Sequence, residues 1–192
     1  MKSEEKEAIF KRIKDILAGS RYGEYEISHG EKVLEHVLEL NPQASPELQI
    51  AAMAHDIERG YDAKDRLNQD QFPGDYDAYK AAHAKRGAEI IFKILHEYDF
   101  LSDEFMNRVS YLIANHEVGG DEDANDLRDA DSVAFMQDSM TGLTNYMSMR
   151  TKEQTVAKLN WMFTRMSEKN KEILKQVYVD CVRRINEFYN KK

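Results

Sequence analysis

Residues 45–60 read SPELQIAAMAHDIERG, an apolar segment that opens with Ser-Pro and leads into a His-Asp pair. Ser45 is a good N-cap and Pro46 suits the first position of a helix, so this stretch predicts a helix with His55 and Asp56 at its C-terminal end. Neighbouring helical side chains point about 100° apart. An imidazole nitrogen and a carboxylate oxygen can therefore bind the same cation.

Two charged residues follow this pair within one helical turn. Glu58 lies three residues after His55, and Arg59 lies three after Asp56, so both are expected beside the predicted metal site. We expect Asp56 and Glu58 to be catalytic, with Glu58 orienting or deprotonating water. The alternative for Glu58 is an exposed acid paired with Arg59. Arg59 itself is a candidate for binding an anionic substrate.

The composition indicates a soluble all-α protein. The chain has 192 residues, of which 42% are hydrophobic and 32% charged, and it contains only three prolines and nine glycines. Such a chain encloses a core without disulfides and leaves long segments for helices. We expect one helical-bundle domain over 1–192, with a metal-site core over about 20–135 and C-terminal helices, 136–190, packing on it.

Charge and hydropathy narrow the range of partners. The net charge of −8, without a basic patch, predicts no binding to nucleic acid. No apolar run approaches the roughly 20 residues that span a bilayer, and residues 1–11 are charged. We therefore expect no signal peptide, no membrane span and a cytoplasmic location, which a single, packed Cys181 also fits. Helical surfaces rich in Met and Tyr leave a homodimer open.

Helical spacing of apolar residues predicts most of the chain to be helical. The expected helices cover 4–18, 28–41, 45–60, 77–98, 102–118, 127–136, 151–166 and 168–189. Residues 61–76 lack such a pattern and contain Pro-Gly, so we expect either a lid or binding segment at the site or a surface excursion. The acidic run 121–129 is expected to be a solvated loop.

Further potential metal ligands recur along the chain. In chain order the predicted ligands are His29, His55, Asp56, His83, His116 and Asp131. Each lies on a predicted helix or near its end, so a bundle can direct all of them into one pocket. His36 lies seven residues after His29 and competes for its role, but we expect His36 to be structural. His96 fits no ligand pattern.

The order His, His-Asp, His, His, Asp over roughly a hundred residues resembles the HD domain superfamily of metal-dependent phosphohydrolases, with GAEI after His83 and DADS around Asp131 adding to the likeness. The resemblance covers about residues 20–135. It implies that His29, His55, Asp56 and Asp131 hold one divalent ion. It also implies a second ion on His83 and His116, with Asp56 as the bridge. The alternative for these two histidines is phosphate binding or support of other ligands.

The same resemblance implies hydrolysis of a small phosphorylated substrate, nucleotides included, by metal-activated water. The ions would be one or two of Fe, Mn, Co, Ni or Zn. Arg86, three residues after His83, and Lys85 are candidate substrate-binding residues, although Lys85 also suits a solvated face. Two alternatives remain open: a di-iron oxygenase of the same fold and a noncatalytic nucleotide-sensing module.

Overall fold

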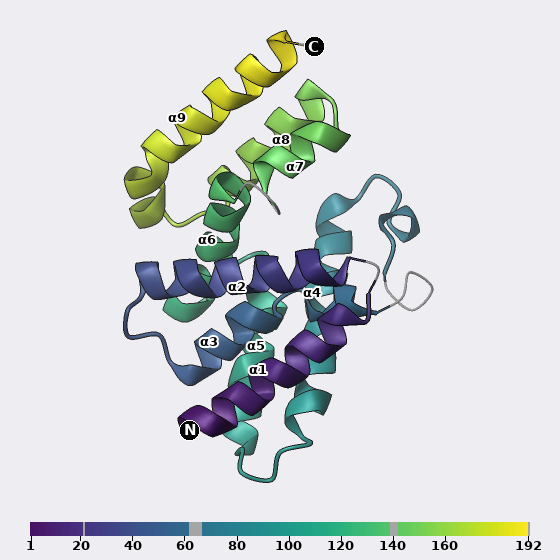
Figure 1. The fold of residues 1–192 in the computed structure, drawn as a ribbon, viewed down its shortest axis with the longest axis vertical. Coiled ribbons are helices and arrows are strands. Elements are labelled where there is room, and N and C mark those ends of the chain that lie inside the picture. Colours follow the sequence, from purple (N-terminus) through teal and green to yellow (C-terminus); the bar gives the residue numbers. More distant parts are fainter. Residues whose placement is uncertain (21, 62–66, 139–141, 192) are drawn as a thin grey trace. The chain divides into compact units, whose positions relative to one another are not determined.

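The computed structural model describes residues 1–20, 22–61, 67–138 and 142–191. Over these ranges the chain is all-α, as predicted, with nine α-helices, two short 3-10 helices and no strand (Figure 1). It divides into two compact units, Met1–Arg128 and Asp129–Lys192. The single domain expected over 1–192 stays a prediction.

The first unit is built from α1 to α5 and two 3-10 helices, η1 and η2. Their bounds are α1 Ser3–Ala18, α2 Gly23–Leu40, α3 Pro46–Ala54, η1 Ile57–Gly60, η2 Gln69–Gln71, α4 Tyr76–Leu95 and α5 Asp103–Asn115. The next helix, α6 Glu122–Gln137, has residues in both units.

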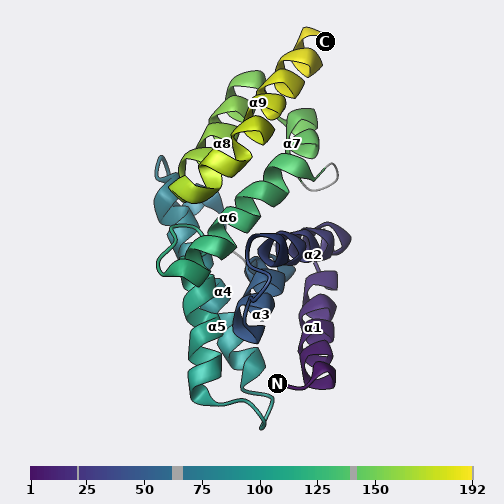
Figure 2. The ribbon, with the colours of Figure 1, turned by 90° about the vertical axis from the view of Figure 1, so that its left-hand side faces the viewer.

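Helix α3 is the central element of the first unit. It contacts α1, α2 and α5 (Figure 2), and all but its first two residues and Gln49 are buried. A helix that is apolar on every side needs such surroundings. Ser45 caps it as predicted, because the Ser45 hydroxyl oxygen accepts a hydrogen bond from the Leu48 amide at 3.2 Å. The α3 helix therefore fixes where the His-Asp pair lies.

The start of α2 was predicted wrongly. The helix begins at Gly23 rather than Ser28, so His29 lies in the second turn instead of the first. Glu24 and Glu26 occupy the first turn, where acidic side chains stabilise a helix N-terminus. A Cβ at Gly23 would lie 2.6 Å from the Cα of Ala18, so only glycine permits this tight turn out of α1.

The prediction of a solvated acidic loop over residues 121–129 is also wrong. Helix α6 begins at Glu122, and the Asp121 carboxylate accepts a hydrogen bond from the Ala124 amide at 3.1 Å. Acidic residues in this position favour the first turn of a helix. Asp129, at the end of the run, is fully buried.

The second unit has its own hydrophobic core. Besides the C-terminal part of α6 it contains α7 Leu143–Met149, α8 Lys152–Thr164 and α9 Glu168–Asn190. Met136, Leu159, Met162 and Ile185 belong to this core, together with Cys181. Burial raises the pKa of the Cys181 thiol, which is therefore a packed thiol, as expected.

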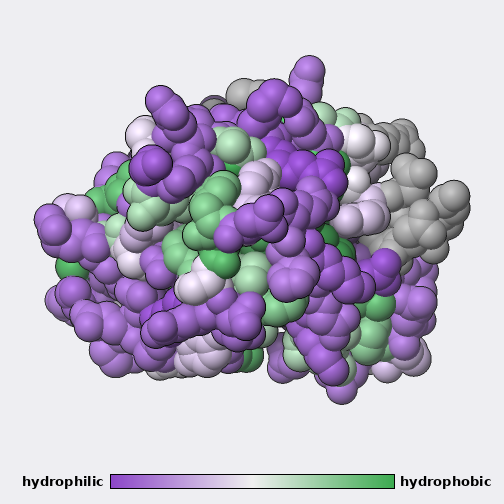
Figure 3. Space-filling model, turned by 90° about the horizontal axis from the view of Figure 1, so that it is seen from below, coloured by the Kyte–Doolittle hydropathy of each residue, from purple (hydrophilic) through white to green (hydrophobic). Residues whose placement is uncertain are grey.

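On the face shown in Figure 3, hydrophilic side chains predominate and hydrophobic ones appear in small groups. None of the helices in the described ranges combines the length and the apolar character that a membrane crossing requires.

Candidate metal centre

The first unit brings five of the six predicted ligands together. They come from α2 (His29), the C-cap of α3 (His55), the residue before η1 (Asp56), α4 (His83) and the C-cap of α5 (His116), and all five are buried. The ring centroids of His29 and His55 lie 5.0 Å apart, and those of His55 and His116 lie 5.3 Å apart. Residues far apart in sequence thus form one cluster.

Asp56 lies at the centre of this cluster. Its Oδ1 is 2.8 Å from Nε2 of His83, and its Oδ2 is 3.5 Å from Nε2 of His55 and 3.9 Å from Nε2 of His29. Asp56, His83 and His116 each offer one ligand atom, and these three atoms lie within 4.8 Å of one another. This spacing fits a single cation, and the two carboxylate oxygens face different histidines.

In three histidines Nδ1 has a partner of its own, and Nε2 is the nitrogen directed at Asp56 or Glu117. Nδ1 of His55 and of His116 lies 2.9 and 2.7 Å from the carbonyl oxygen three residues earlier. Because a carbonyl only accepts, each Nδ1 carries the proton. Nδ1 of His83 lies 3.0 Å from Glu58 Oε2. Metal-binding histidines are oriented in this way by a partner on the second nitrogen.

The position of Asp56 depends on its neighbours. Asp56 has backbone angles of φ −99° and ψ 20°, which end α3 at Ala54 rather than near Gly60 as expected. Burial alone would raise the pKa of the Asp56 carboxyl, but Arg59, followed by His55 and His83, lowers it well below its ordinary value. Asp56 is therefore held as an anion.

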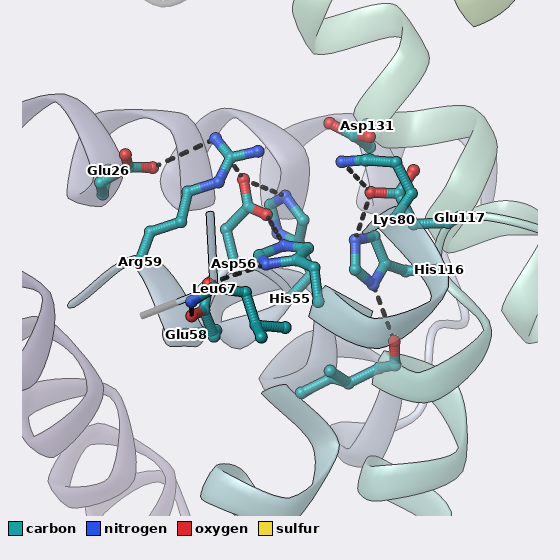
Figure 4. A network of polar contacts seen from close by, with 12 residues as sticks. Glu26, His55, Asp56, Glu58, Arg59, Leu67, Lys80, His116, Glu117 and Asp131 are labelled. Atoms are coloured by element: carbon teal, nitrogen blue, oxygen red, sulfur yellow. Dashed lines mark hydrogen bonds and ion pairs between the residues drawn. The ribbon is translucent and has the colours of Figure 1, made fainter. Parts of the chain in front are cut away.

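Arg59 pairs with Asp56 and Glu26, not with Glu58. Its Nη1 lies 3.0 Å from Asp56 Oδ2 and 3.6 Å from Glu26 Oε2 (Figure 4). Glu58 is 1% exposed, so the alternative of an exposed acid is wrong. Its Oε2 contacts His83, and its Oε1 accepts a hydrogen bond from the Leu67 amide at 2.6 Å. Glu58 therefore orients the His83 ring through Nδ1, the nitrogen that does not face Asp56.

Leu67 belongs to the irregular stretch 61–76, which thus contacts the candidate site at this residue. Residues 62–66 of the stretch lie outside the described residues. Arg86 Nε lies 4.0 Å from Glu58 Oε1, and its side chain is partly exposed. Lys85 is exposed, which fits the solvated face named as its alternative. Substrate binding by Arg86 or Lys85 stays a prediction.

Sequence reasoning missed a buried ion pair beside His116. Lys80 on α4 pairs with Glu117, and both side chains are buried. Glu117 Oε1 lies 3.1 Å from Nε2 of His116. Burial opposes the charge of Lys80, but Glu117 more than offsets this and raises the pKa of the ammonium. The signal was present, since Lys80 precedes His83 by one helical turn and Glu117 adjoins His116.

Asp131, His36 and His96 are the other residues considered from the sequence. Asp131 belongs to the second unit, where Arg165 pairs with it, and its role as a sixth ligand stays a prediction. His36 Nδ1 lies 2.7 Å from Oε2 of Glu39, a contact that fits the structural role expected of it. His96 is exposed at the end of α4.

One family model, described as a domain of unknown function (DUF4202), matches residues 12–187. No curated protein and no solved structure matches the chain. The match includes all five predicted ligand residues of the first unit and the Lys80–Glu117 pair.

Proposed function

We propose that the chain, which belongs to the DUF4202 family, is a metal-dependent phosphohydrolase that cleaves a phosphate ester or anhydride. The observation that carries the proposal is the buried cluster in which His55, His83 and His116 direct Nε2 at carboxylates while Nδ1 is hydrogen-bonded. The resemblance of the ligand order to HD domain phosphohydrolases supplies the reaction class.

The donor set fits one or two divalent transition metal ions. Imidazole nitrogens combined with carboxylate oxygens suit Fe, Mn, Co, Ni and Zn. The buried acidic residues around the site are Glu26, Asp56, Glu58 and Glu117. Within the described ranges, Arg59 and Lys80 pair with them and Arg86 reaches Glu58 from 4.0 Å, so these four acids outnumber the three cations when the histidines are neutral. A bound divalent ion would offset this charge, whose burial is otherwise unfavourable.

Each residue has a part in this proposal. A bound ion would supply Lewis acidity, which activates water and draws charge from a phosphoryl oxygen. Asp56 faces His83 with one oxygen and His55 with the other, so it would contribute a carboxylate oxygen to either ion. Arg59 keeps Asp56 charged and oriented. Glu58 accepts the hydrogen bond of His83 Nδ1. It would also transfer protons to or from water.

We expect Glu58→Gln to weaken metal binding by roughly 10- to 100-fold, the usual cost of losing a partner behind a ligating histidine. A glutamine has one accepting oxygen, so it cannot serve both His83 and the Leu67 amide as Glu58 does. Competition with a chromogenic chelator measures the affinity. Glu89→Gln on the exposed face of α4 is the control, and equal affinities for both variants would contradict the role given to Glu58.

Elemental analysis combined with a phosphate-release assay tests the function. We expect roughly one to two transition metal ions per chain and phosphate release that stops on chelation and returns with added metal. Mononucleotides, dinucleoside polyphosphates and sugar phosphates form the first panel of substrates. Bound iron with substrate-dependent oxygen uptake, and no phosphate release, would instead favour the oxygenase. Binding without turnover would favour the sensing module.

Removing the metal should lower the thermal stability of the protein. A ligand present at 100 times its dissociation constant stabilises the folded state by about 2.7 kcal/mol, which corresponds to a melting temperature roughly 5 to 10 °C higher for a chain of this size. We therefore expect a chelator to lower the melting temperature by that amount in differential scanning calorimetry. The variant Asp56→Asn should show little change on chelation. The same decrease in both proteins would contradict metal binding at this cluster.

A further inference from the structure

The Lys80–Glu117 pair is buried beside the predicted ligands rather than in the scaffold. The side chains of Lys80 and Glu117 are 8% and 4% exposed. Lys80 precedes His83 by three residues on α4, so both lie on the same face of that helix. Glu117 directly follows His116 and contacts its Nε2 at 3.1 Å. The ammonium therefore lies close to His116, on the helix face that also carries His83.

Stability alone does not explain an ion pair in this position. A buried ion pair gains little over well-packed apolar residues of similar volume, because both charges lose their hydration. The pair also adds a charged carboxylate next to His116, which packing of the helices alone does not require. A buried cation that is paired with a carboxylate and lies at a reaction centre is suited to binding an anion.

The other cations of the site are less suited to this role. Arg59 is held between Asp56 and Glu26, so its charge is already shared by two carboxylates. Arg86 lies 4.0 Å from Glu58, and its side chain is 37% exposed. Lys80 is the buried cation on the His116 side of the cluster.

We propose that Lys80 binds the phosphoryl group of the substrate and that Glu117 is its partner while the substrate is absent. The inference rests on the function proposed above. On binding, phosphoryl oxygens accept hydrogen bonds from the Lys80 ammonium in place of the Glu117 carboxylate. No covalent bond is made or broken in this exchange. Glu117 and the phosphoryl group compete for one cation. Removing Lys80 should therefore lower phosphate affinity, and removing the charge of Glu117 should raise it.

Isothermal titration calorimetry of the metal-loaded protein with inorganic phosphate measures the phosphate affinity of this subsite without requiring turnover. We expect Lys80→Met to weaken phosphate binding by roughly 10- to 100-fold, the range for losing a charge-assisted hydrogen bond. Glu117→Gln should strengthen it several-fold. Lys93→Met, thirteen residues further along the same helix and exposed, is the matched control and should bind as the unmodified protein does.

Because Lys80→Met leaves Glu117 buried without this partner, the double variant Lys80→Met/Glu117→Leu removes both charges and guards against a folding defect. It should fold, keep its metal and still bind phosphate weakly. Phosphate affinity equal to that of the unmodified protein would overturn the role of Lys80. Loss of metal from Glu117→Gln would also overturn it, since Glu117 would then be a ligand.

Failure of the underlying function looks different. If the unmodified, metal-loaded protein binds no phosphate and hydrolyses no phosphorylated compound, the phosphohydrolase proposal itself is wrong. If the unmodified protein binds phosphate and the Lys80 variants match it, only the assignment of Lys80 is wrong.

Discussion

The double variant His55→Ala/Asp56→Ala should lose its bound metal and its turnover together. Asp56 lies within 4 Å of nitrogens from His29, His55 and His83, so its removal takes away the carboxylate that these histidines share. An ion that no longer binds cannot lower the pKa of water, and we expect kcat to fall by more than roughly a thousandfold. Elemental analysis and phosphate release, measured on the same preparation, check this result.

A matched control separates loss of the site from general damage. His96 and Asp99 are exposed, and the variant His96→Ala/Asp99→Ala removes the same two kinds of side chain from the surface. It should keep its metal and its activity. Circular dichroism shows whether each variant folds, and Asp56→Asn preserves the shape of the side chain if the alanine variant does not. Hydrolysis that survives in a folded His55→Ala/Asp56→Ala protein would refute the site.

Local signals in the sequence were sufficient for most helices of the fold. Ser45 with Pro46, and Ser102, start helices as predicted because their hydroxyl groups accept backbone amide hydrogen bonds within the same turn. The start of α2 could not be read in this way. It depends on how closely Gly23 approaches Ala18, which is a packing distance between two helices rather than a property of either helix.

In the candidate site, too, residue identities could be predicted from the sequence but contacts between distant residues could not. Residue type and chain order identified His29, His55, Asp56, His83 and His116, which the first unit does bring together. Partners were harder to predict, because pairing is set by the folded geometry. From the sequence, an exposed pairing with the adjacent Arg59 was the alternative for Glu58, whereas Glu58 is buried and contacts His83, 25 residues later.

A side chain at Gly30 should destabilise the first unit and weaken its metal site. A Cβ added there would lie 2.7 Å from the backbone carbonyl oxygen of Met53 on α3, and a backbone atom cannot move aside alone. We expect Gly30→Val to lower the free energy of unfolding by about 3 kcal/mol, the upper part of the range for overpacking. Separation of α2 from α3 would also draw His29 away from His55, so metal affinity should fall as well.

Gly87→Ala supplies the comparison that makes this prediction specific. Its added Cβ would meet the Ile113 Cγ2 methyl group at 3.3 Å, and a side chain can yield by a few tenths of an ångström. Replacing a helical glycine by alanine otherwise gains about 1 kcal/mol, so Gly87→Ala should be close to neutral while Gly30→Ala is destabilising. Urea unfolding of all three variants measures the difference. A stabilised Gly30→Ala would mean that α2 and α3 do not meet at this glycine, and the approach of His29 to His55 would lose its structural basis.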